Sequence, residues 1–320
     1  MAFHLLTADQ ARGGSAGGAS SQSLGYAVGA LCWLLSANVY IAVKFVVADL
    51  PPFTLALCRA LLAALVLLPF VYQYRSEMAQ LFKERWFEIL IIGGSGLFLT
   101  QALIFLGLLY TDVINCGLII SLMPIITMVL AFFVLGEPMG AWQAVGAAVS
   151  FAGMIVIIVH GQLSQLLGLN FNIGELWVLL GAFGFGLYTV LLRRAKFKLD
   201  RLPLLVMLLL AGSAVGLPFA ITEILLGDHF TMDMRGALAL GYCAIFGGAL
   251  MYWLFNWSIE ILGAAKAGLL MYLQMLFVPF FAYLILGEKL QPYHFVGGAL
   301  ILLGIVVIVL RSPKPKAATS

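Results

Sequence analysis

Ten apolar stretches divide the chain, and each is long enough to cross a bilayer as a helix. A transmembrane helix needs about 20 mostly apolar residues, and the stretches that qualify are 24–47, 53–74, 86–110, 114–135, 140–159, 173–192, 203–226, 236–258, 265–286 and 292–311. Their hydrophobic positions run continuously, which excludes the alternating pattern of an outer-membrane barrel. The pattern predicts an all-α membrane protein with ten transmembrane helices.

The composition supports a membrane location. Of 320 residues, 63% are hydrophobic and 10% are charged, whereas soluble domains average about 45–50% apolar and about 25% charged residues. This excludes an ordinary cytosolic enzyme, a nucleic-acid binder and a disordered protein. The net charge of +3 implies no polyanionic partner. The expected partners are the lipid bilayer and a small-molecule substrate, with the chain acting as a monomer or homodimer.

The cysteines and histidines predict neither a metal site nor a cofactor. The cysteines lie inside apolar runs without a CxxC pair, as expected of small buried hydrophobes rather than disulfides: Cys32, Cys58, Cys116 and Cys243. The histidines lie in the N-terminal tail or near predicted helix ends: His4, His160, His229 and His294. The middle of the membrane is therefore expected to lack metal ligands.

Basic residues are unevenly distributed over the predicted span ends. With the N-terminus inside, the inner segments carry thirteen Lys and Arg residues, and the outer segments with their helix ends carry four: Lys44, Arg59, Arg235 and Lys289. Because cytoplasmic loops carry the excess of Lys and Arg, both termini are predicted to be cytoplasmic. We expect a multi-pass protein of the inner (plasma) membrane of the cell.

The two halves of the sequence resemble each other at an offset of 151 residues. Gly117-Leu118 corresponds to Gly268-Leu269, and Leu135-Gly136-Glu137 corresponds to Leu286-Gly287-Glu288. Each half therefore has five spans, and because five is odd the second copy enters from the opposite side. This predicts an inverted repeat, with a substrate site between the halves near the middle of the membrane.

The repeat divides the chain into five parts. Residues 24–159 form the first five-helix repeat, residues 160–172 a connecting loop, and residues 173–311 the second repeat. Residues 1–23 are rich in Gly, Ser and Ala, lack the features of a signal peptide, and are predicted to be a disordered cytoplasmic tail. Residues 312–320 form a short basic cytoplasmic tail.

Ten spans, two five-helix repeats and a Leu-Gly-Glu at the end of spans four and nine resemble the drug/metabolite transporter (DMT) superfamily, in its EamA-type branch. Within that branch the chain is most similar to bacterial amino-acid exporters of the YddG type. The resemblance covers residues 24–311. It implies a carrier of small metabolites in a cell membrane, often an exporter of amino acids or related compounds.

Polar and aromatic side chains inside the spans are candidates for substrate binding, because polar groups in hydrocarbon are costly and mark functional sites. Trp33, Ser36 and Tyr40 share a helix face, and so do Tyr252, Trp253 and Asn256. The candidates are Trp33, Ser36, Tyr40, Gln101, Tyr188, Tyr252, Trp253, Asn256 and Tyr272. Alternatively, the amides and hydroxyls form interhelical hydrogen bonds, and the rings near span ends lie in the interfacial belt.

The charged residues near the span ends have structural interpretations. Arg59 and Lys44 are expected to extend outward to the membrane surface, with pairing to an anionic substrate group in the outer vestibule as the alternative. Glu223 is expected at the interface. Glu137 and Glu288 follow glycines that end spans four and nine, and both are expected to face water. The middle of the membrane is thus predicted to offer no fixed countercharge to a solute.

Prolines and glycines predict how the helices bend and pack. Pro124 and Pro279 remove backbone hydrogen bonds from spans four and nine. They are read as kinks that let these helices flex during access switching, or as fixed kinks that shape the cavity. Glycines seven residues apart predict a packing seam between spans five and ten: Gly146 with Gly153, and Gly297 with Gly304.

Together these features predict a carrier that exports amino acids or similar small neutral or zwitterionic metabolites by alternating access through a central cavity. A facilitative mechanism is favoured, because neither a carboxylate nor a histidine lies in the central third of any span. A proton-coupled multidrug or metabolite antiporter is the alternative. A membrane-embedded enzyme is a further alternative, disfavoured because the sequence has no Walker A loop, no HExxH motif and no evident acid–histidine pair. A channel lacks a charged ring or filter motif.

Overall fold

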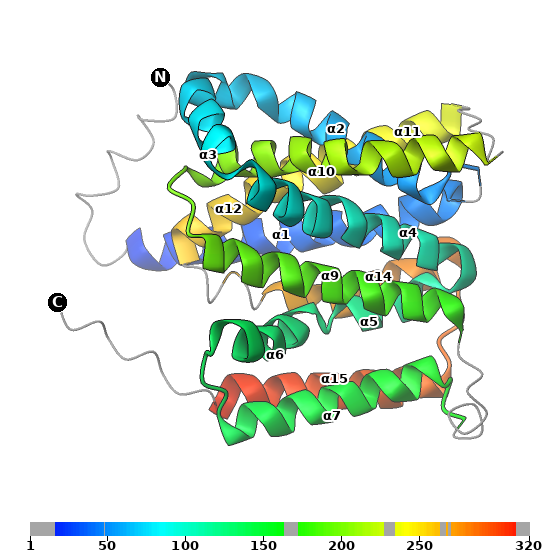
Figure 1. Ribbon diagram of the computed structural model, residues 1–320. Coiled ribbons are helices and arrows are strands. Elements are labelled where there is room, and N and C mark those ends of the chain that lie inside the picture. The colour runs from blue at the N-terminus through cyan, green and yellow to red at the C-terminus, as the bar shows by residue number, and fades with distance from the viewer. Residues whose placement is uncertain are drawn as a thin grey trace.

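The computed structural model of the chain describes residues 17–47, 49–162, 172–226, 234–262, 267 and 270–311, with the backbone alone at residues 17–21, 256, 260 and 311. All secondary structure in this part of the chain is helical, which confirms the predicted all-α class (Figure 1). Residues 1–16 and 312–320 of the predicted tails, with His4 and His229, lie outside it.

The described part of the first half contains nine helical segments. They are α1 (Gly17–Val46), α2 (Pro52–Val71), η2 (Tyr72–Tyr74), α3 (Arg75–Gly93), η3 (Gly94–Leu99), α4 (Thr100–Tyr110), α5 (Val113–Ile120), α6 (Met123–Leu135) and α7 (Ala141–Ile158), and α9 (Ile173–Ala195) opens the second half. Because α1 begins at Gly17, residues 17–23 of the predicted tail are helical.

The second half continues after α9 in the same manner. Its remaining segments are α10 (Arg201–Leu225), α11 (Met234–Ala244), η4 (Ile245–Leu250), α12 (Met251–Leu262), η5 (Leu270–Leu273), α14 (Gln274–Phe281), η6 (Ala282–Leu286) and α15 (Pro292–Arg311). The beginning of the predicted ninth span, 265–286, falls largely outside the described residues.

Eight helices in the described part of the chain are long and apolar enough to cross a membrane. One of them, Pro52–Tyr110, is a continuous helical stretch of 59 residues that contains two of the predicted spans, because η2 joins α2 to α3 without a break. Leu270–Leu286 is apolar but shorter. The predicted count of ten stays a prediction.

The two halves enter the bundle from opposite ends. The start of α1 and the end of α15 lie at one end, here named the terminal end (left in Figure 1), and the opposite end is the far end. Lys44 near the end of α1 and Asn172 at the start of α9 both donate hydrogen bonds to carbonyls at the end of α4, to Leu108 and Tyr110 respectively. Thus α1 and α9 are antiparallel, as the odd number of spans in each half predicts.

The repeat seen in the sequence is visible in the backbone. The π-helical segments η3 and η4 begin at Gly94 and Ile245, 151 residues apart. Gly136 and Gly287, at the same offset, end their helices with φ of +67° and +69°. Glycine adopts this left-handed conformation without the steric penalty that a Cβ would bring. The prediction that the Gly-Glu pairs terminate spans four and nine is confirmed.

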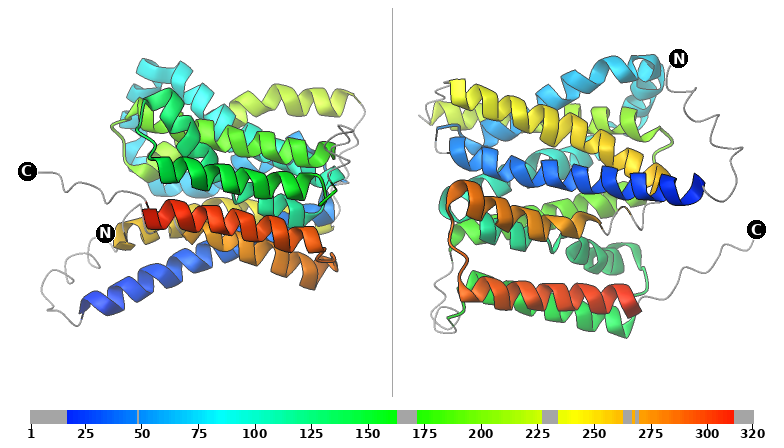
Figure 2. Two further views of the ribbon diagram at one scale, coloured as in Figure 1. Left: turned by 90° about the horizontal axis from the view of Figure 1, so that it is seen from below. Right: turned by 180° about the vertical axis from the view of Figure 1, so that it is seen from behind.

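α7 and α15 pack side by side along one edge of the bundle (Figure 2). A Cβ added at Gly153 would lie 2.5 Å from the carbonyl oxygen of Gly297, and one at Gly146 would lie 2.6 Å from that of Gly304. The backbones are therefore too close for larger side chains. This confirms the predicted seam between spans five and ten.

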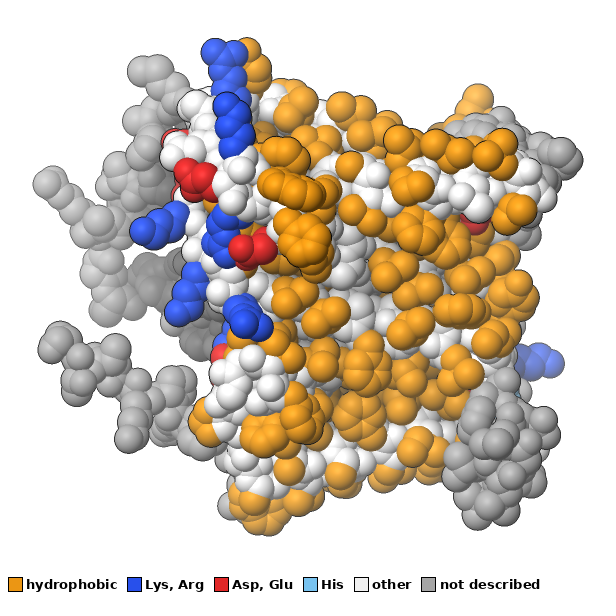
Figure 3. All heavy atoms as spheres, viewed as in Figure 1, with side chains coloured by type: hydrophobic (Ala, Val, Ile, Leu, Met, Phe, Trp, Pro, Cys, Tyr) orange, Lys and Arg blue, Asp and Glu red, His pale blue; other side chains and the backbone are white. Residues whose placement is uncertain are grey.

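Hydrophobic side chains cover much of the bundle's side, and Lys and Arg gather at the terminal end (Figure 3). Phe133, for example, is 75% exposed and Leu238 is 66% exposed. A surface of this kind is suited to lipid rather than to water. The main core lies between helices of both halves and joins residues of α1, α4, α5 and α14.

Candidate functional site

A small polar cluster joins the two halves inside the bundle. Ser36 and Tyr40 lie one turn apart on α1, and Gln274 is the first residue of α14. The Gln274 amide Nε2 donates a hydrogen bond of 2.7 Å to Ser36 Oγ, and Tyr40 shares a further hydrogen bond with Gln274. All three side chains are buried. The structure thus brings two predicted residues, Ser36 and Tyr40, together with Gln274, which was not among the candidates predicted from the sequence.

Two further predicted residues, Tyr188 and Tyr252, lie near each other between the halves. They are close enough to interact electrostatically, and both are half-buried. The ring of Tyr188 lies against Gly96 of η3, where an added Cβ would overlap it. The glycine in this π-helical segment therefore makes room for an aromatic ring from α9.

Arg59 lies inside the bundle and does not extend outward. Its side chain is only 4% exposed, and Nη2 donates a hydrogen bond of 2.7 Å to the carbonyl oxygen of Gly247 in η4. Tyr40 and Tyr252 lie close enough to the guanidinium of Arg59 to interact with it electrostatically. The expectation that Arg59 reaches the membrane surface is wrong, and so is the expectation that the middle of the membrane offers no fixed positive charge. The irregular turn of η4 presents a carbonyl that holds the guanidinium inside.

Other predicted residues lie apart from this cluster. Trp33 packs edge-on against Phe255, with 5.4 Å between ring centroids, in a separate group of side chains between α1 and α12. Trp253 is 37% exposed and packs against Trp257. Gln101 is half-buried on α4 and Tyr272 is half-buried on η5. The side chain of Asn256 lies outside the described part of the structure.

The two prolines that were predicted to kink their helices occupy different positions in them. Pro124 occupies the first turn of α6, directly after the helix breaks at residues 121–122. Pro279 lies inside α14, three residues before the π-helical segment η6. Span nine has its own break at η5, Leu270–Leu273, which corresponds in the repeat to the break in span four. Both spans are therefore irregular at corresponding positions, and in span nine the irregular segment directly precedes Gln274 of the polar cluster.

Carboxylates of the second half hold helix starts of the first half at the far end. Glu223 accepts hydrogen bonds from the backbone N–H groups of Phe53 (3.2 Å) and Thr54 (2.8 Å), and from the Thr54 hydroxyl (2.9 Å). A carboxylate at a helix N-terminus satisfies free N–H groups and matches the helix dipole. Glu223 thus caps α2, a role that its expected interfacial position did not include.

Glu288 has the same role for α5. It accepts hydrogen bonds from the N–H groups of Val113 (2.8 Å) and Ile114 (2.9 Å). Burial raises the pKa of Glu288 above its ordinary value of 4.5, with the two N–H donors acting in the opposite direction. The expectation that Glu288 simply faces water is wrong, whereas its counterpart Glu137 is 43% exposed and pairs with Arg193 at 2.5 Å.

Lys44 holds the neighbouring helix end. Its Nζ donates hydrogen bonds of 2.7 Å to the carbonyl oxygens of Leu108 and Thr111, at the end of α4. The carbonyls at a helix C-terminus attract a cation. Lys44 therefore caps the end of α4 at the far end, a contact that its expected outward extension did not include.

A buried cluster of titratable side chains completes the far end. Glu175 is fully buried, and its Oε1 contacts His160 Nε2 at 2.9 Å and accepts a hydrogen bond of 2.6 Å from Asn115. The amide oxygen of Asn115 lies 2.8 Å from His294 Nε2. Thr111 donates a longer hydrogen bond of 3.3 Å to Glu175. Four helix ends thus meet around one carboxylate.

The Glu175 cluster corrects the expectation, drawn from the sequence, that the chain has no acid–histidine pair. Glu175 and His160 are an acid–histidine pair, which sequence inspection did not find because the two residues lie in different predicted elements. The available signal was a carboxylate in the first turn of an apolar span, with polar residues at the matching ends of other spans. Glu175 Oε2 is buried without a hydrogen-bond partner in the described structure.

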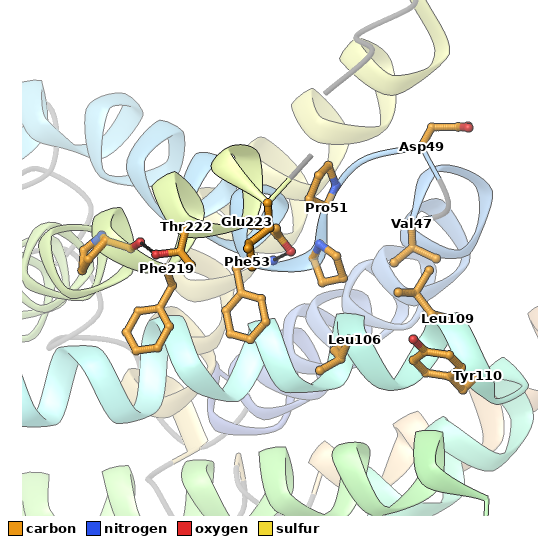
Figure 4. A pocket seen from close by; sticks show the side chains of 13 residues that line it. Val47, Asp49, Pro51, Phe53, Leu106, Leu109, Tyr110, Phe219, Thr222 and Glu223 are labelled. Atoms are coloured by element: carbon orange, nitrogen blue, oxygen red, sulfur yellow. Dashed lines mark hydrogen bonds between the residues drawn. The ribbon is translucent and has the colours of Figure 1, made fainter. Parts of the chain in front are cut away.

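The described structure also has pockets away from these clusters. One of about 780 Å³ at the far end is lined by side chains of α2, α4 and α10 and of the connection between α1 and α2, and contains Phe53, Phe219 and Glu223 (Figure 4). Phe53 and Phe219 stack with centroids 5.8 Å apart. A second pocket of about 630 Å³ at the terminal end contains Glu137 and Arg193. Neither of these two is lined by the predicted substrate residues, whose buried members lie between the halves.

A helical membrane protein of two antiparallel halves, with polar side chains buried between them, has the architecture of a secondary transporter. The chain matches the EamA-like transporter family twice, over residues 23–159 and 172–310, and belongs to that family. The two matches coincide with the two halves of the fold. This confirms the resemblance drawn from the Leu-Gly-Glu repeat.

Relatives carry the same general description. The chain is 28% identical over 278 residues to the uncharacterized transporter YyaM of Bacillus subtilis, covering 85% of this chain and 89% of that one. It is 27% identical to an uncharacterized transporter of Archaeoglobus fulgidus (88% and 96% covered), and 28% identical to a chloroplastic WAT1-related protein of Arabidopsis thaliana (84% and 65% covered). A solved crystal structure shares the fold, with a TM-score of 0.61 at 19% identity over 90% of this chain and 97% of that one.

Proposed function

We propose that this membrane transporter exports amino acids or similar small zwitterionic metabolites by alternating access, through a site between its two halves. The observation that carries the proposal is the hydrogen-bonded cluster of Ser36, Tyr40 and Gln274, which is contributed by both halves. Amide and hydroxyl groups can replace the water around a polar solute. The neighbouring rings of Tyr188 and Tyr252 can cover its apolar part.

The contacts at the far end fit one state of such a cycle. Glu223 and Glu288 of the second half cap α2 and α5 of the first half, so these contacts join the two halves at the far end. Their counterpart at the terminal end, the pair Glu137–Arg193, is exposed. Alternating access requires the far-end contacts to break when the site opens to that side. The basic terminal end fits the cytoplasm of a plasma membrane.

Transport is tested with the purified protein in sealed proteoliposomes. Counterflow of radiolabelled amino acids, screened one at a time, is expected to show accumulation driven by unlabelled substrate on the other side. Ser36→Ala and Gln274→Ala are expected to reduce this exchange at least tenfold. Protein-dependent binding without flux would contradict the carrier and indicate a receptor, and flux without counterflow would indicate a channel.

A second candidate function is proton-coupled antiport, and the Glu175 cluster is the observation that favours it. A fully buried carboxylate with a free oxygen can hold a proton. It is faced by His160 directly, by His294 through Asn115, and by Tyr293, all in elements that meet at the far end. A carboxylate that gains or loses a proton as this end opens would couple proton movement to the cycle.

The two mechanisms differ in what drives uphill movement. Under antiport, a pH gradient alone drives accumulation in the wild type, and Glu175→Gln loses this drive while retaining counterflow. Under facilitated transport, a pH gradient alone drives nothing in either protein. Glu137→Gln, which changes an exposed carboxylate paired with Arg193 at the terminal end, serves as the control.

A further inference from the structure

Within the described part of the structure, Arg59 is a charged side chain without a charged partner, in the middle of the protein. It lies seven residues from the start of α2, which corresponds to about 10 Å at 1.5 Å per residue. Its hydrogen-bond acceptor, Gly247, lies at the centre of the 26-residue span Met234–Ile259. The guanidinium is therefore at mid-depth in the bundle, where a charge is costly unless it is compensated.

The described contacts compensate it only in part. The side chain is 96% buried; Nη2 bonds to Gly247, while Nε is buried without any hydrogen-bond partner. No salt bridge in the described residues includes Arg59. The groups that interact with it electrostatically, Tyr40, Tyr252 and Cys243, are all weak acids that carry no charge at neutral pH.

We propose that Arg59 binds the carboxylate of the transported solute. This inference rests on the proposed carrier function and names the group that its substrate must carry. Guanidinium presents planar N–H donors that match the geometry of a carboxylate. A solute held there would accept a hydrogen bond from Nε of Arg59, near the hydroxyls of Tyr40 and Tyr252, and Tyr40 connects this position to Ser36 and Gln274.

The surroundings of Arg59 specify a single negative charge. One guanidinium among neutral hydroxyls balances a monocarboxylate, whereas a phosphate dianion would keep an excess charge in a dry interior. The site also joins the two halves, because Arg59 and Tyr40 come from the first half and Gly247, Tyr252 and Gln274 from the second. A bound carboxylate would thus contact both halves, as a carrier requires.

The test compares carboxylates with their uncharged amides. Thermal unfolding of the purified protein in detergent is measured with L-leucine, L-phenylalanine and L-threonine, with the carboxamide of each, and with inorganic phosphate. The wild type is expected to be stabilised by at least one of the amino acids and not by its carboxamide or by phosphate. Arg59→Gln is expected to weaken that binding at least tenfold, and Arg59→Lys to weaken it less. Arg75→Gln, which changes an exposed arginine at the terminal end, is the matched control and should bind as the wild type does.

Several outcomes would overturn the inference. One is a wild type that no carboxylate of the panel stabilises, and another is a carboxamide that binds as well as its acid. A third is an unchanged amino-acid affinity in Arg59→Gln. If Arg59 only tied α2 to η4, ligand-free Arg59→Gln would unfold at a lower temperature and its affinity would not change. The inference instead expects ligand-free Arg59→Gln to be at least as stable as the wild type, since it removes an uncompensated buried charge.

Flux measurements separate this inference from the carrier function. If amino acids bind in an Arg59-dependent way but no counterflow occurs in proteoliposomes, the carrier function fails and the carboxylate site stands. If carboxamides are carried as fast as the amino acids, the carrier function stands and the role of Arg59 is rejected.

Discussion

The amide of Gln274 donates a hydrogen bond of 2.7 Å to the hydroxyl of Ser36, and this bond connects α14 of the second half to α1 of the first. The two residues are 238 positions apart in the chain. Both side chains are buried, so this hydrogen bond satisfies polar groups that water does not reach. The bond therefore contributes to the stability of the contact between the halves as well as to the proposed site.

Gln274→Leu is expected to be more destabilising than Ser36→Ala. The leucine leaves the hydroxyls of Ser36 and Tyr40 buried without this partner, and such a loss costs about 1–3 kcal/mol. Thermal unfolding in detergent measures the difference. Equal stability of Gln274→Leu and the wild type would show that the hydrogen bonds contribute nothing measurable.

The seam between α7 and α15 depends on its glycines. Gly153→Val is expected to lower the unfolding temperature, because the added side chain meets the backbone of Gly297 and overpacking costs about 1–3 kcal/mol. Gly241→Ala is the control, since an added Cβ meets nothing within 4 Å there. Similar stability of the two variants would contradict close packing at the seam.

The capping carboxylate Glu223 is expected to matter more than the exposed carboxylate Glu137. Removal of a helix cap costs about 0.5–2 kcal/mol, whereas an exposed ion pair contributes about 0.2–1 kcal/mol. Glu223→Ala should therefore unfold at a lower temperature than Glu137→Ala. The opposite order would indicate that α2 does not need Glu223 at its start.

Glu288 predicts a specific pH dependence. Its pKa in the folded protein is raised above 4.5 by burial, so the folded state favours the protonated form. The stability contributed by this group is therefore present below 4.5 and is lost as the pH rises through the raised pKa. The unfolding temperature of the wild type relative to Glu288→Gln should thus increase as the pH falls from neutral toward 4.5.

The counterpart in the repeat provides the comparison for this prediction. Glu137→Gln changes the carboxylate after Gly136, as Glu288→Gln changes the one after Gly287. A wild type that loses stability relative to Glu288→Gln as the pH falls would contradict the prediction. The prediction would also be contradicted if the difference in unfolding temperature between the wild type and Glu137→Gln changed with pH in the same way as the difference between the wild type and Glu288→Gln.

The orientation of the protein can be tested with single cysteines. Lys198 is exposed at the terminal end and Lys289 at the far end, whereas Cys32, Cys116 and Cys243 are buried. In a Cys58→Ser background, an impermeant maleimide is expected to label Lys289→Cys in intact cells and Lys198→Cys only after permeabilisation. The reverse result would place the termini outside the cell.

The sequence by itself determined the elements and their repetition. Continuous apolar stretches predicted helices, because a helix satisfies its own backbone hydrogen bonds in lipid. The offset of 151 predicted matching helix ends, and Gly136 and Gly287 end their helices in the same left-handed conformation. The seam of Gly146 and Gly153 was also predictable, since residues seven apart lie on the same face of a helix.

Only the tertiary structure decided the direction and partners of the charged side chains. From its position on α2, the Arg59 side chain could extend to the surface or to the interior. It lies in the interior because it donates a hydrogen bond to the carbonyl oxygen of Gly247, 188 residues away in the chain. The cluster around Glu175 likewise combines His160 with Asn115, which bonds to His294 179 positions away. Contacts of this separation leave no local pattern in a sequence, because they depend on which helix ends meet when the two halves pack together.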